Sequence, residues 1–179
     1  SKTNTKNLQA NLIFSSKENI DIIVNALSGS YKTIIKDKNG NYFCTDLFKV
    51  CEQNQRIKIL YELMDSIGED CCDKFGAYPI QTLIDFSSCE KEYELLLHSF
   101  NDYNRLLYAS LDPIGSYTIQ KIIEHIPEKF RNQFNFNFIS MICFISIKKY
   151  GIINAKKFIS CTKNEENINQ IINLVSNKI

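Results

Sequence analysis

Three tyrosines recur along the chain, each two residues after a glycine: Tyr42, Tyr78 and Tyr117. Polar or small side chains flank each tyrosine, one residue before it and three residues after it. These flanking residues are Asn41 with Thr45, Ala77 with Gln81, and Ser116 with Gln120. A tyrosine ring offers a flat face for stacking, and a glutamine amide offers both a donor and an acceptor. Such side chains suit binding by stacking and hydrogen bonding rather than catalysis.

The glycines that precede these tyrosines mark an internal repeat. Gly40, Gly76, Gly115 and Gly151 are separated by 36, 39 and 36 residues. A spacing near 36 is typical of a three-helix repeat that stacks into a solenoid. The sequence therefore predicts four units of one architecture, with a local insertion in the third.

The residues after each glycine carry a helical pattern. Apolar side chains at positions four, seven and eight after the glycine form a stripe with a period near 3.6, which predicts a core-facing surface. In the first three units they are Cys44, Leu47 and Phe48; Ile80, Leu83 and Ile84; and Ile119, Ile122 and Ile123. Positions one, two and five are expected on the opposite side, facing solvent or a ligand. The glycine itself suits a sharp turn into this helix.

A third helix follows in each unit. Its candidate segments are Gln55–Met64, Lys91–Phe100, Lys129–Ile139 and Glu165–Asn177. Pro127 stands where the insertion of the third unit is expected. We predict a flexible segment at 1–16, a capping helix at 17–28, and repeats at about 29–64, 65–100, 101–139 and 140–179. The cap would cover the first apolar face of the stack.

Composition favours a folded protein of a reducing compartment. Hydrophobic residues make up 44% of the 179 residues and charged residues 23%, with a net charge of +1. The seven cysteines have no regular spacing and form no Cys-x-x-Cys pair, so neither a disulfide framework nor a zinc site is expected. The longest apolar stretch, Phe136–Ile147, is too short for a membrane span and predicts a buried helix. We expect a cytoplasmic protein, with the nucleolus as the alternative location.

Three segments in register carry a family resemblance. They are Lys-Asn-Gly-Asn-Tyr at 38–42, Asp-Lys-Phe-Gly-Ala-Tyr-Pro-Ile-Gln at 73–81 and Ile-Gly-Ser-Tyr-Thr-Ile-Gln-Lys-Ile-Ile-Glu-His at 114–125. With these motifs, the chain resembles the Pumilio-type (PUF) repeat family over about Gly29 to Ile179. The resemblance implies an all-α, right-handed α-solenoid of three-helix, armadillo-like repeats that binds single-stranded RNA. PUF crescents usually have eight repeats, and this chain has four units.

The resemblance also implies roles for the side chains after each glycine. Two would contact a base edge, at Asn41 with Thr45, Ala77 with Gln81, and Ser116 with Gln120. The residue between them would stack on bases, at Tyr42, Tyr78 and Tyr117. In the family's code, Ser with Gln implies adenine opposite the third unit. The fourth unit departs from this pattern, since it has Ile152, Ile153 and Lys156 at these positions, and only Lys156 could meet a phosphate.

Two functions from different classes remain open. The first is binding of single-stranded RNA, either messenger RNA in post-transcriptional regulation or ribosomal RNA in association with the ribosome. The second is a helical scaffold that binds a protein partner, which the low net charge favours and in which the tyrosines are packing or interface residues. The aspartates three residues before the first three glycines, Asp37, Asp73 and Asp112, are predicted to stabilise turns. No motif of an enzyme or of a cofactor site is present, so we expect neither catalysis nor a cofactor.

Overall fold

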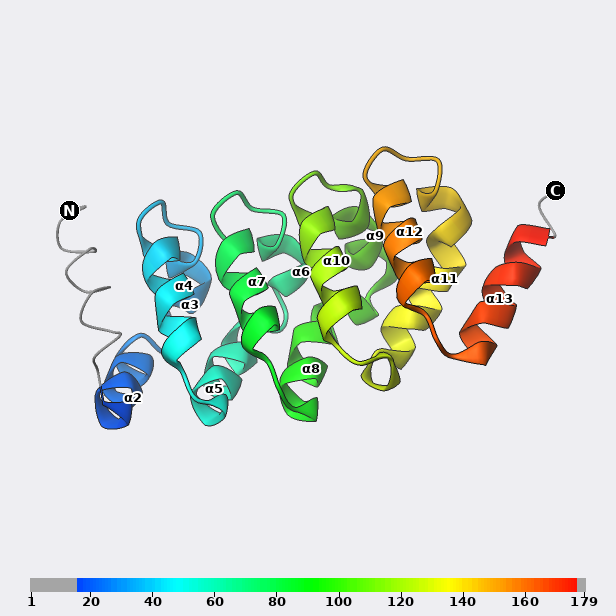
Figure 1. The fold of residues 1–179 in the computed structure, drawn as a ribbon. Helices are drawn as coiled ribbons and strands as arrows, with labels where there is room; N and C mark the ends of the chain where they lie inside the picture. Colours follow the sequence, from blue (N-terminus) through cyan, green and yellow to red (C-terminus); the bar gives the residue numbers. More distant parts are fainter. Residues whose placement is uncertain (1–15, 177–179) are drawn as a thin grey trace.

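The computed structural model describes residues 16–176, and within that range the chain is helical and has no β-strand (Figure 1). The predicted flexible segment 1–16 lies outside the described residues except for Ser16. The chain runs as a row of similar helical units, which confirms the predicted all-α solenoid (Figure 1).

The helices follow the predicted order. The capping helix α2 spans Lys17–Ala26. The first unit holds α3 (Tyr31–Ile34), α4 (Gly40–Val50) and α5 (Gln53–Leu63), and the second holds α6 (Ile67–Asp70), α7 (Ala77–Phe86), α8 (Glu90–Leu97) and the 3-10 helix η1 (His98–Asn101). The rest of the chain forms α9 (Tyr103–Leu111), α10 (Gly115–His125), the 3-10 helix η2 (Glu128–Phe130), α11 (Asn132–Ile145), α12 (Gly151–Cys161) and α13 (Glu165–Ser176).

The second helices of the units stand side by side. Helices α4, α7, α10 and α12 pack in that order and form one face of the molecule (Figure 1). The other helices form the rest of the stack, where α5 packs against α8 and α9 packs against α11. Each second helix therefore shows the same side to solvent as its neighbours, and residues at equivalent positions fall into rows.

The apolar stripe of the second helices forms the core. Residues at positions four, seven and eight after the glycine are at most 2% exposed in the first three units, as predicted. Phe138 of α11 stacks on Phe158 of α12 with ring centroids 4.5 Å apart, which extends the same core into the fourth unit. Burial of these side chains is the main source of stability in a solenoid, where each unit contacts only its neighbours.

Glycine stands at the predicted turn into each second helix because space is short there, and not because the turn needs a left-handed backbone. A Cβ on Gly76 would lie 2.7 Å from the carbonyl oxygen of Asp70. A Cβ on Gly115 would lie 2.9 Å from the carbonyl oxygen of Ala109. Among residues 16–176 only Gly29 has a left-handed backbone, with φ of 82°. The repeat glycine therefore lets the start of the second helix touch the end of the first.

The boundary between the third and fourth units differs from the predicted position between residues 139 and 140. Helix α11 runs from Asn132 to Ile145 without a break, so it serves as the third helix of one unit and the first of the next. Asn, Phe and Ile fill this segment, and no Gly or Pro interrupts it. The insertion lies where Pro127 predicted it, as the short helix η2. Glu128 of η2 accepts hydrogen bonds from the backbone N–H groups of Lys163 and Asn164, just before α13.

A buried ion pair joins the first two units. Arg56 Nε of α5 lies 2.6 Å from Glu92 Oε1 of α8, and the two side chains are 8% and 0% exposed. Arg56 also donates from Nη1 to the carbonyl oxygen of Cys51, and Glu92 accepts from the backbone N–H of Ser88. Both charges are thus paired and hydrogen-bonded, which is the condition under which a protein tolerates them in its interior.

Replacing Glu92 with alanine should destabilise the stack, because Arg56 would then be a buried charge without its partner. We expect a loss of about 3–5 kcal/mol in the free energy of unfolding, measured by urea denaturation. Glu94→Ala is the matched control, since it removes an exposed carboxylate that pairs with Lys91 on the same helix. Equal effects of the two substitutions would contradict this role of the buried pair.

Candidate functional site

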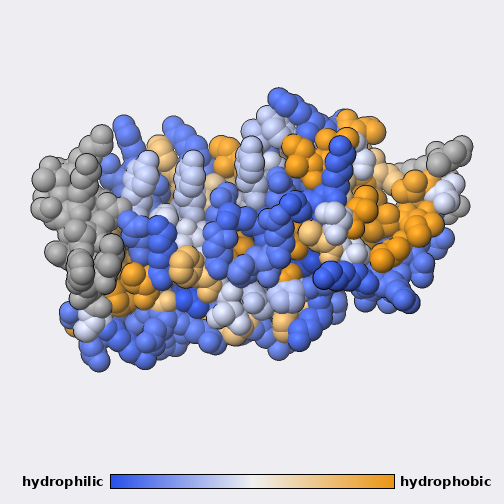
Figure 2. All heavy atoms as spheres, viewed as in Figure 1, coloured by the Kyte–Doolittle hydropathy of each residue, from blue (hydrophilic) through white to orange (hydrophobic). Residues whose placement is uncertain are grey.

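The three repeat tyrosines form an exposed ridge on the face made by α4, α7 and α10. Tyr42, Tyr78 and Tyr117 are 61%, 62% and 63% exposed, and each occupies the same position on its helix. We call these three residues the tyrosine ridge. Because the helices that carry them pack side by side, the rings repeat at the spacing of the units, as predicted. The surface of this face is mostly polar over α4, α7 and α10 (Figure 2).

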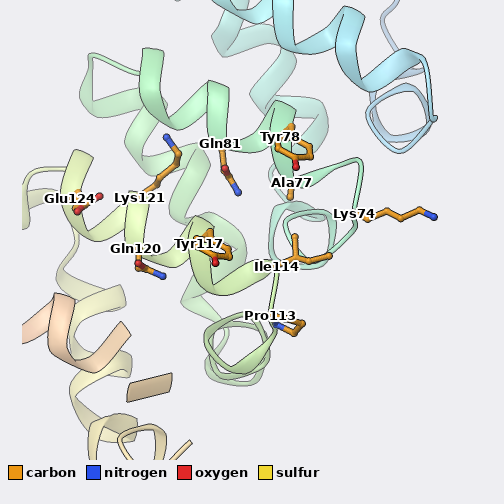
Figure 3. Close-up of a pocket in the computed structure, with 10 residues that line it drawn as sticks. All are labelled: Lys74, Ala77, Tyr78, Gln81, Pro113, Ile114, Tyr117, Gln120, Lys121 and Glu124. Atoms are coloured by element: carbon orange, nitrogen blue, oxygen red, sulfur yellow. The ribbon is translucent and has the colours of Figure 1, made fainter. Parts of the chain in front are cut away.

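A groove lies between the second and third tyrosines. It has a volume of about 520 Å³ and lies between α7 and α10 (Figure 3). Its lining comprises Lys74, Ala77, Tyr78, Gln81, Pro113, Ile114, Tyr117, Gln120, Lys121 and Glu124. We call it the α7–α10 groove. It brings together two tyrosines and both repeat glutamines, which the sequence predicted as partners in binding.

Both glutamine amides are anchored by hydrogen bonds to the protein. Gln81 Nε2 donates to Thr118 Oγ1 of the next unit at 3.2 Å. Gln120 Nε2 donates to the carbonyl oxygen of Ser116 in its own helix at 3.1 Å. Each Nε2 has a second hydrogen, so both amides keep donor and acceptor capacity for a ligand in the groove.

In the first three units the first position after the glycine is buried, contrary to the prediction that it faces solvent. Asn41, Ala77 and Ser116 are only 1–2% exposed. Side chains advance about 100° per residue around a helix, which places position one about 70° from the centre of the apolar stripe. Position five lies about 110° from that centre and position two about 170°. The structure follows this order, since position one is buried, position five half-buried and position two exposed.

In the first unit, the two predicted base-contacting side chains are hydrogen-bonded to the protein's own backbone. Asn41 Nδ2 donates to the carbonyl oxygens of Asp37 and Lys38, both at 2.9 Å. Thr45 Oγ1 donates to the carbonyl oxygen of Asn41 at 2.8 Å. In the third unit, Ser116 Oγ donates to the carbonyl oxygen of Pro113 at 3.4 Å. The base-contacting roles of these residues remain predictions, and in this structure their polar groups have partners within the protein.

The repeat aspartates stabilise the turn before each second helix, as the sequence indicated. Asp37 Oδ1 accepts from the backbone N–H groups of Asn39 and Gly40, at 2.9 and 2.7 Å. Asp73 and Asp112 make the same pair of bonds in their own units. These bonds favour the ionised carboxylate and hold the pKa of Asp37 below its usual value. The aspartates thereby fix the helix start from which each tyrosine projects.

The fourth unit presents an apolar surface in place of the ridge. Ile152 and Ile153 of α12 are 39% and 47% exposed. Exposed isoleucines continue onto α13 at Ile168 and Ile172, and apolar side chains gather at this end of the molecule in Figure 2. Lys156 is exposed beside them, and its contact with a phosphate remains a prediction.

Ion pairs connect neighbouring units along the same face, and the sequence analysis missed them. Lys121 of α10 lies 2.5 Å from Asp85 of α7, and Lys157 of α12 pairs with Glu124 of α10. In both pairs the lysine is six residues after its glycine and the acid is nine residues after the preceding glycine. That offset is visible in the sequence once the units are aligned. The pairs neutralise much of the charge beside the groove.

Three of the cysteine side chains lie in the core. Cys44, Cys51 and Cys71 are buried, and burial raises the pKa of the Cys44 thiol to about 12. Within residues 16–176, no cluster of three or more potential metal ligands is present. In the same range, no helix has the length and apolar character to cross a membrane.

Comparison with known proteins tests the family resemblance. A model of the Pumilio-family RNA binding repeat matches residues 31–64 and 110–134. These segments contain α3 to α5 of the first unit and α10 of the third. The two matched segments contain the glycine and tyrosine motifs of the first and third units. The resemblance inferred from the glycine and tyrosine motifs is thereby confirmed.

Proteins with Pumilio repeats are similar to the chain at low identity. Pumilio homolog 12 of Arabidopsis thaliana is 22% identical over 119 residues, which are 64% of this chain and 20% of that protein. A Pumilio domain-containing protein of Schizosaccharomyces pombe is 25% identical over 153 residues, which are 85% of this chain and 22% of that protein. The chain thus spans about a fifth of the length of these relatives.

Solved Pumilio domains have the same fold. The RNA-binding domain of yeast Puf5p bound to SMX2 RNA matches with a TM-score of 0.85 at 19% identity, over 96% of this chain and 49% of that domain. The Puf4 RNA binding domain bound to HO endonuclease RNA matches with a TM-score of 0.85 at 18% identity, over 94% of this chain and 51% of that domain. The chain covers about half of each Pumilio solenoid.

The Asp37 carboxyl should titrate below 3.8, the ordinary value for aspartate, because two backbone N–H groups bond its ionised form. A depressed pKa means that the contribution to stability is complete above the unfolded value and is lost as the pH falls through the folded value. Carbon-13 NMR of the Asp37 carboxyl would measure its pKa in the folded protein and in the urea-unfolded chain, which is the reference. A midpoint equal to that of the unfolded chain would show that the turn bonds are absent in solution.

Proposed function

We propose that this protein binds single-stranded RNA along the tyrosine ridge. The observation that carries the proposal is the arrangement of three equally exposed tyrosines on adjacent helices. Between two of them lies the α7–α10 groove, with glutamine amides at its wall. Nucleobases have flat faces and polar edges, and the groove offers rings for the faces and amides for the edges.

Stacking supplies most of the affinity in this proposal. Base–aromatic stacking contributes about 1–3 kcal/mol per base and tolerates any base, since every base has a π-face. A base in the α7–α10 groove would lie between the Tyr78 and Tyr117 rings. Gln81 and Gln120 would then hydrogen-bond to base edges, which is how proteins recognise unpaired bases in sequence-specific RNA binding.

The similar solved structures support an RNA ligand. The titles of the Puf5p and Puf4 structures describe domains bound to RNA. Within the described residues we propose three stacking positions, at Tyr42, Tyr78 and Tyr117. By the family's code, the Ser116 and Gln120 pair would prefer adenine.

Charge contributes little to this mode of binding. The net charge is +1, and two lysines of this face, Lys121 of α10 and Lys157 of α12, already pair with carboxylates. Phosphate contacts then fall to exposed lysines such as Lys156. We expect few phosphate contacts, and therefore a shallow dependence of affinity on salt concentration.

The cellular role that we propose is control of messenger RNA or association with ribosomal RNA, in the cytoplasm or the nucleolus. Crosslinking in cells followed by sequencing of the bound RNA distinguishes the two classes of target. Partners such as the ribosome or other proteins belong to the same proposal.

A protein-binding scaffold is the second candidate function. The exposed apolar surface of α12 and α13, at Ile152, Ile153 and Ile172, favours it. Surfaces of this kind commonly mark contacts with other proteins. The scaffold function predicts that RNA binding is absent or does not depend on the tyrosine ridge.

Tyr78→Ala and Tyr117→Ala should each weaken binding to a randomised single-stranded RNA, because each removes a stacking surface. The expected loss is about 1–3 kcal/mol per substitution, measured by equilibrium fluorescence anisotropy. Tyr108→Ala is the matched control, since Tyr108 is also 62% exposed but lies on α9, outside the row of second helices.

Unchanged RNA binding in both ridge variants would exclude base stacking and favour the scaffold. A similar loss in the Tyr108 variant would mean that the substitutions act on the fold rather than on the site.

A further inference from the structure

We propose that Thr118 is a specificity-determining residue that positions the Gln81 amide from the neighbouring unit. The inference rests on the proposed RNA-binding function and deepens it. It assigns base selection at the second unit to a side chain of the third unit. Thr118 does not contact the base in this proposal and acts as a positioning residue.

The contact between the two side chains crosses from one unit to the next. Gln81 Nε2 on α7 donates to Thr118 Oγ1 on α10 at 3.2 Å. Thr118 is fully buried, with 0% of its surface exposed, so its hydroxyl is held in place by the packing of α10. The half-buried Gln81 lines the α7–α10 groove, and Figure 3 shows its amide pointing from α7 toward α10 and Tyr117. A fixed hydroxyl therefore anchors a side chain that faces the groove.

Gln81 carries the whole polar contact with a base edge at its unit. The other predicted base-contacting residue there is Ala77, which has no polar side-chain group. A glutamine amide presents an oxygen at one end and an NH₂ group at the other, so its orientation decides whether it accepts or donates. Thr118 accepts from the NH₂ end, which leaves the oxygen free to accept from a base.

The hydrogen bond from Gln81 to Thr118 joins a residue five after one glycine to a residue three after the next. The other units place different residues at these two offsets, and the Gln120 amide bonds instead to Ser116 of its own helix. The corresponding pairs are Pro79 with Thr45 and Asn154 with Gln120. A polar residue thus occurs where the preceding unit has glutamine, and an apolar proline occurs where it has threonine, which bonds to its own helix. Asn154 is fully buried, and its Oδ1 has no hydrogen-bond partner in the described part of the chain.

Anchoring of this kind favours one orientation before the ligand arrives. A free glutamine samples many rotamers and both orientations of its amide, and binding would have to select one of them. The hydrogen bond to Thr118 restricts the rotamers of the side chain within the folded protein, with the NH₂ group toward Thr118. The discrimination between bases at this position should therefore depend on a residue that never meets the RNA.

Thr118→Val tests the proposal, because valine keeps the shape of threonine and removes the hydroxyl. The probe is a randomised pool of single-stranded RNA, sequenced before and after binding to the full chain. We expect the base preference at one position of the enriched motif to fall by about three- to tenfold, with other positions unchanged. Gln81→Ala should abolish the preference at the same position, and adding Thr118→Val to it should have no further effect.

Thr82→Val is the matched control. Thr82 is also buried, but its hydroxyl donates to the carbonyl oxygen of Tyr78 within α7. The enriched motif of this variant should equal that of the wild type, and circular dichroism should show the same thermal unfolding for all single variants.

The results distinguish a failure of the Thr118 inference from a failure of the proposed RNA binding. If the wild type enriches a motif and Thr118→Val leaves every position of it unchanged, the role of Thr118 is wrong while RNA binding stands. An equal fall at all positions would also overturn it, because that marks a general structural role. If the wild type binds no RNA from the pool, both the proposed function and this inference fail.

Discussion

The close approach between the end of each first helix and the start of each second helix governs the geometry of this protein. At Gly76 and Gly115 a Cβ would meet a carbonyl oxygen of the preceding helix, so only glycine permits the contact. The adjacent aspartate bonds the backbone N–H groups at the same junction. Together they fix the rotation of the second helix about its axis. That rotation places position two outward in every unit, and the tyrosine ridge follows from it.

The sequence predicted much of this arrangement because the repeat imposes the same geometry several times. The exposure of Tyr78 and the burial of Ile80 and Leu83 follow from helical periodicity alone. The burial of Asn41 could also have been predicted, since position one lies nearer to the apolar stripe than position two does. A second helix has intermediate positions between its buried and exposed sides, and the side chain of Asn41 occupies one of them.

Other features could not be predicted because they depend on how neighbouring helices are placed. The continuity of α11 joins two units that the repeat treats as separate, and no residue in Asn132–Ile145 forces either outcome. The bond from Gln81 to Thr118 and the ion pair of Lys121 with Asp85 cross between units at distances set by their packing. The sequence shows that polar and charged residues recur at fixed positions of the repeat. Which of them come into contact depends on how far apart and at what angle neighbouring units pack.

The surface chemistry of the site is consistent with binding through ring faces and amides more than through charge. An ion pair with Asp85 occupies Lys121 at the groove, and the exposed rings remain available. NMR of the protein with an unstructured single-stranded RNA tests the central claim most directly, through intermolecular nuclear Overhauser effects at the tyrosine rings. The account predicts such effects between base protons and the rings of Tyr78 and Tyr117, and none at Tyr108. Effects confined to residues outside the tyrosine ridge, or their complete absence with bound RNA, would contradict it.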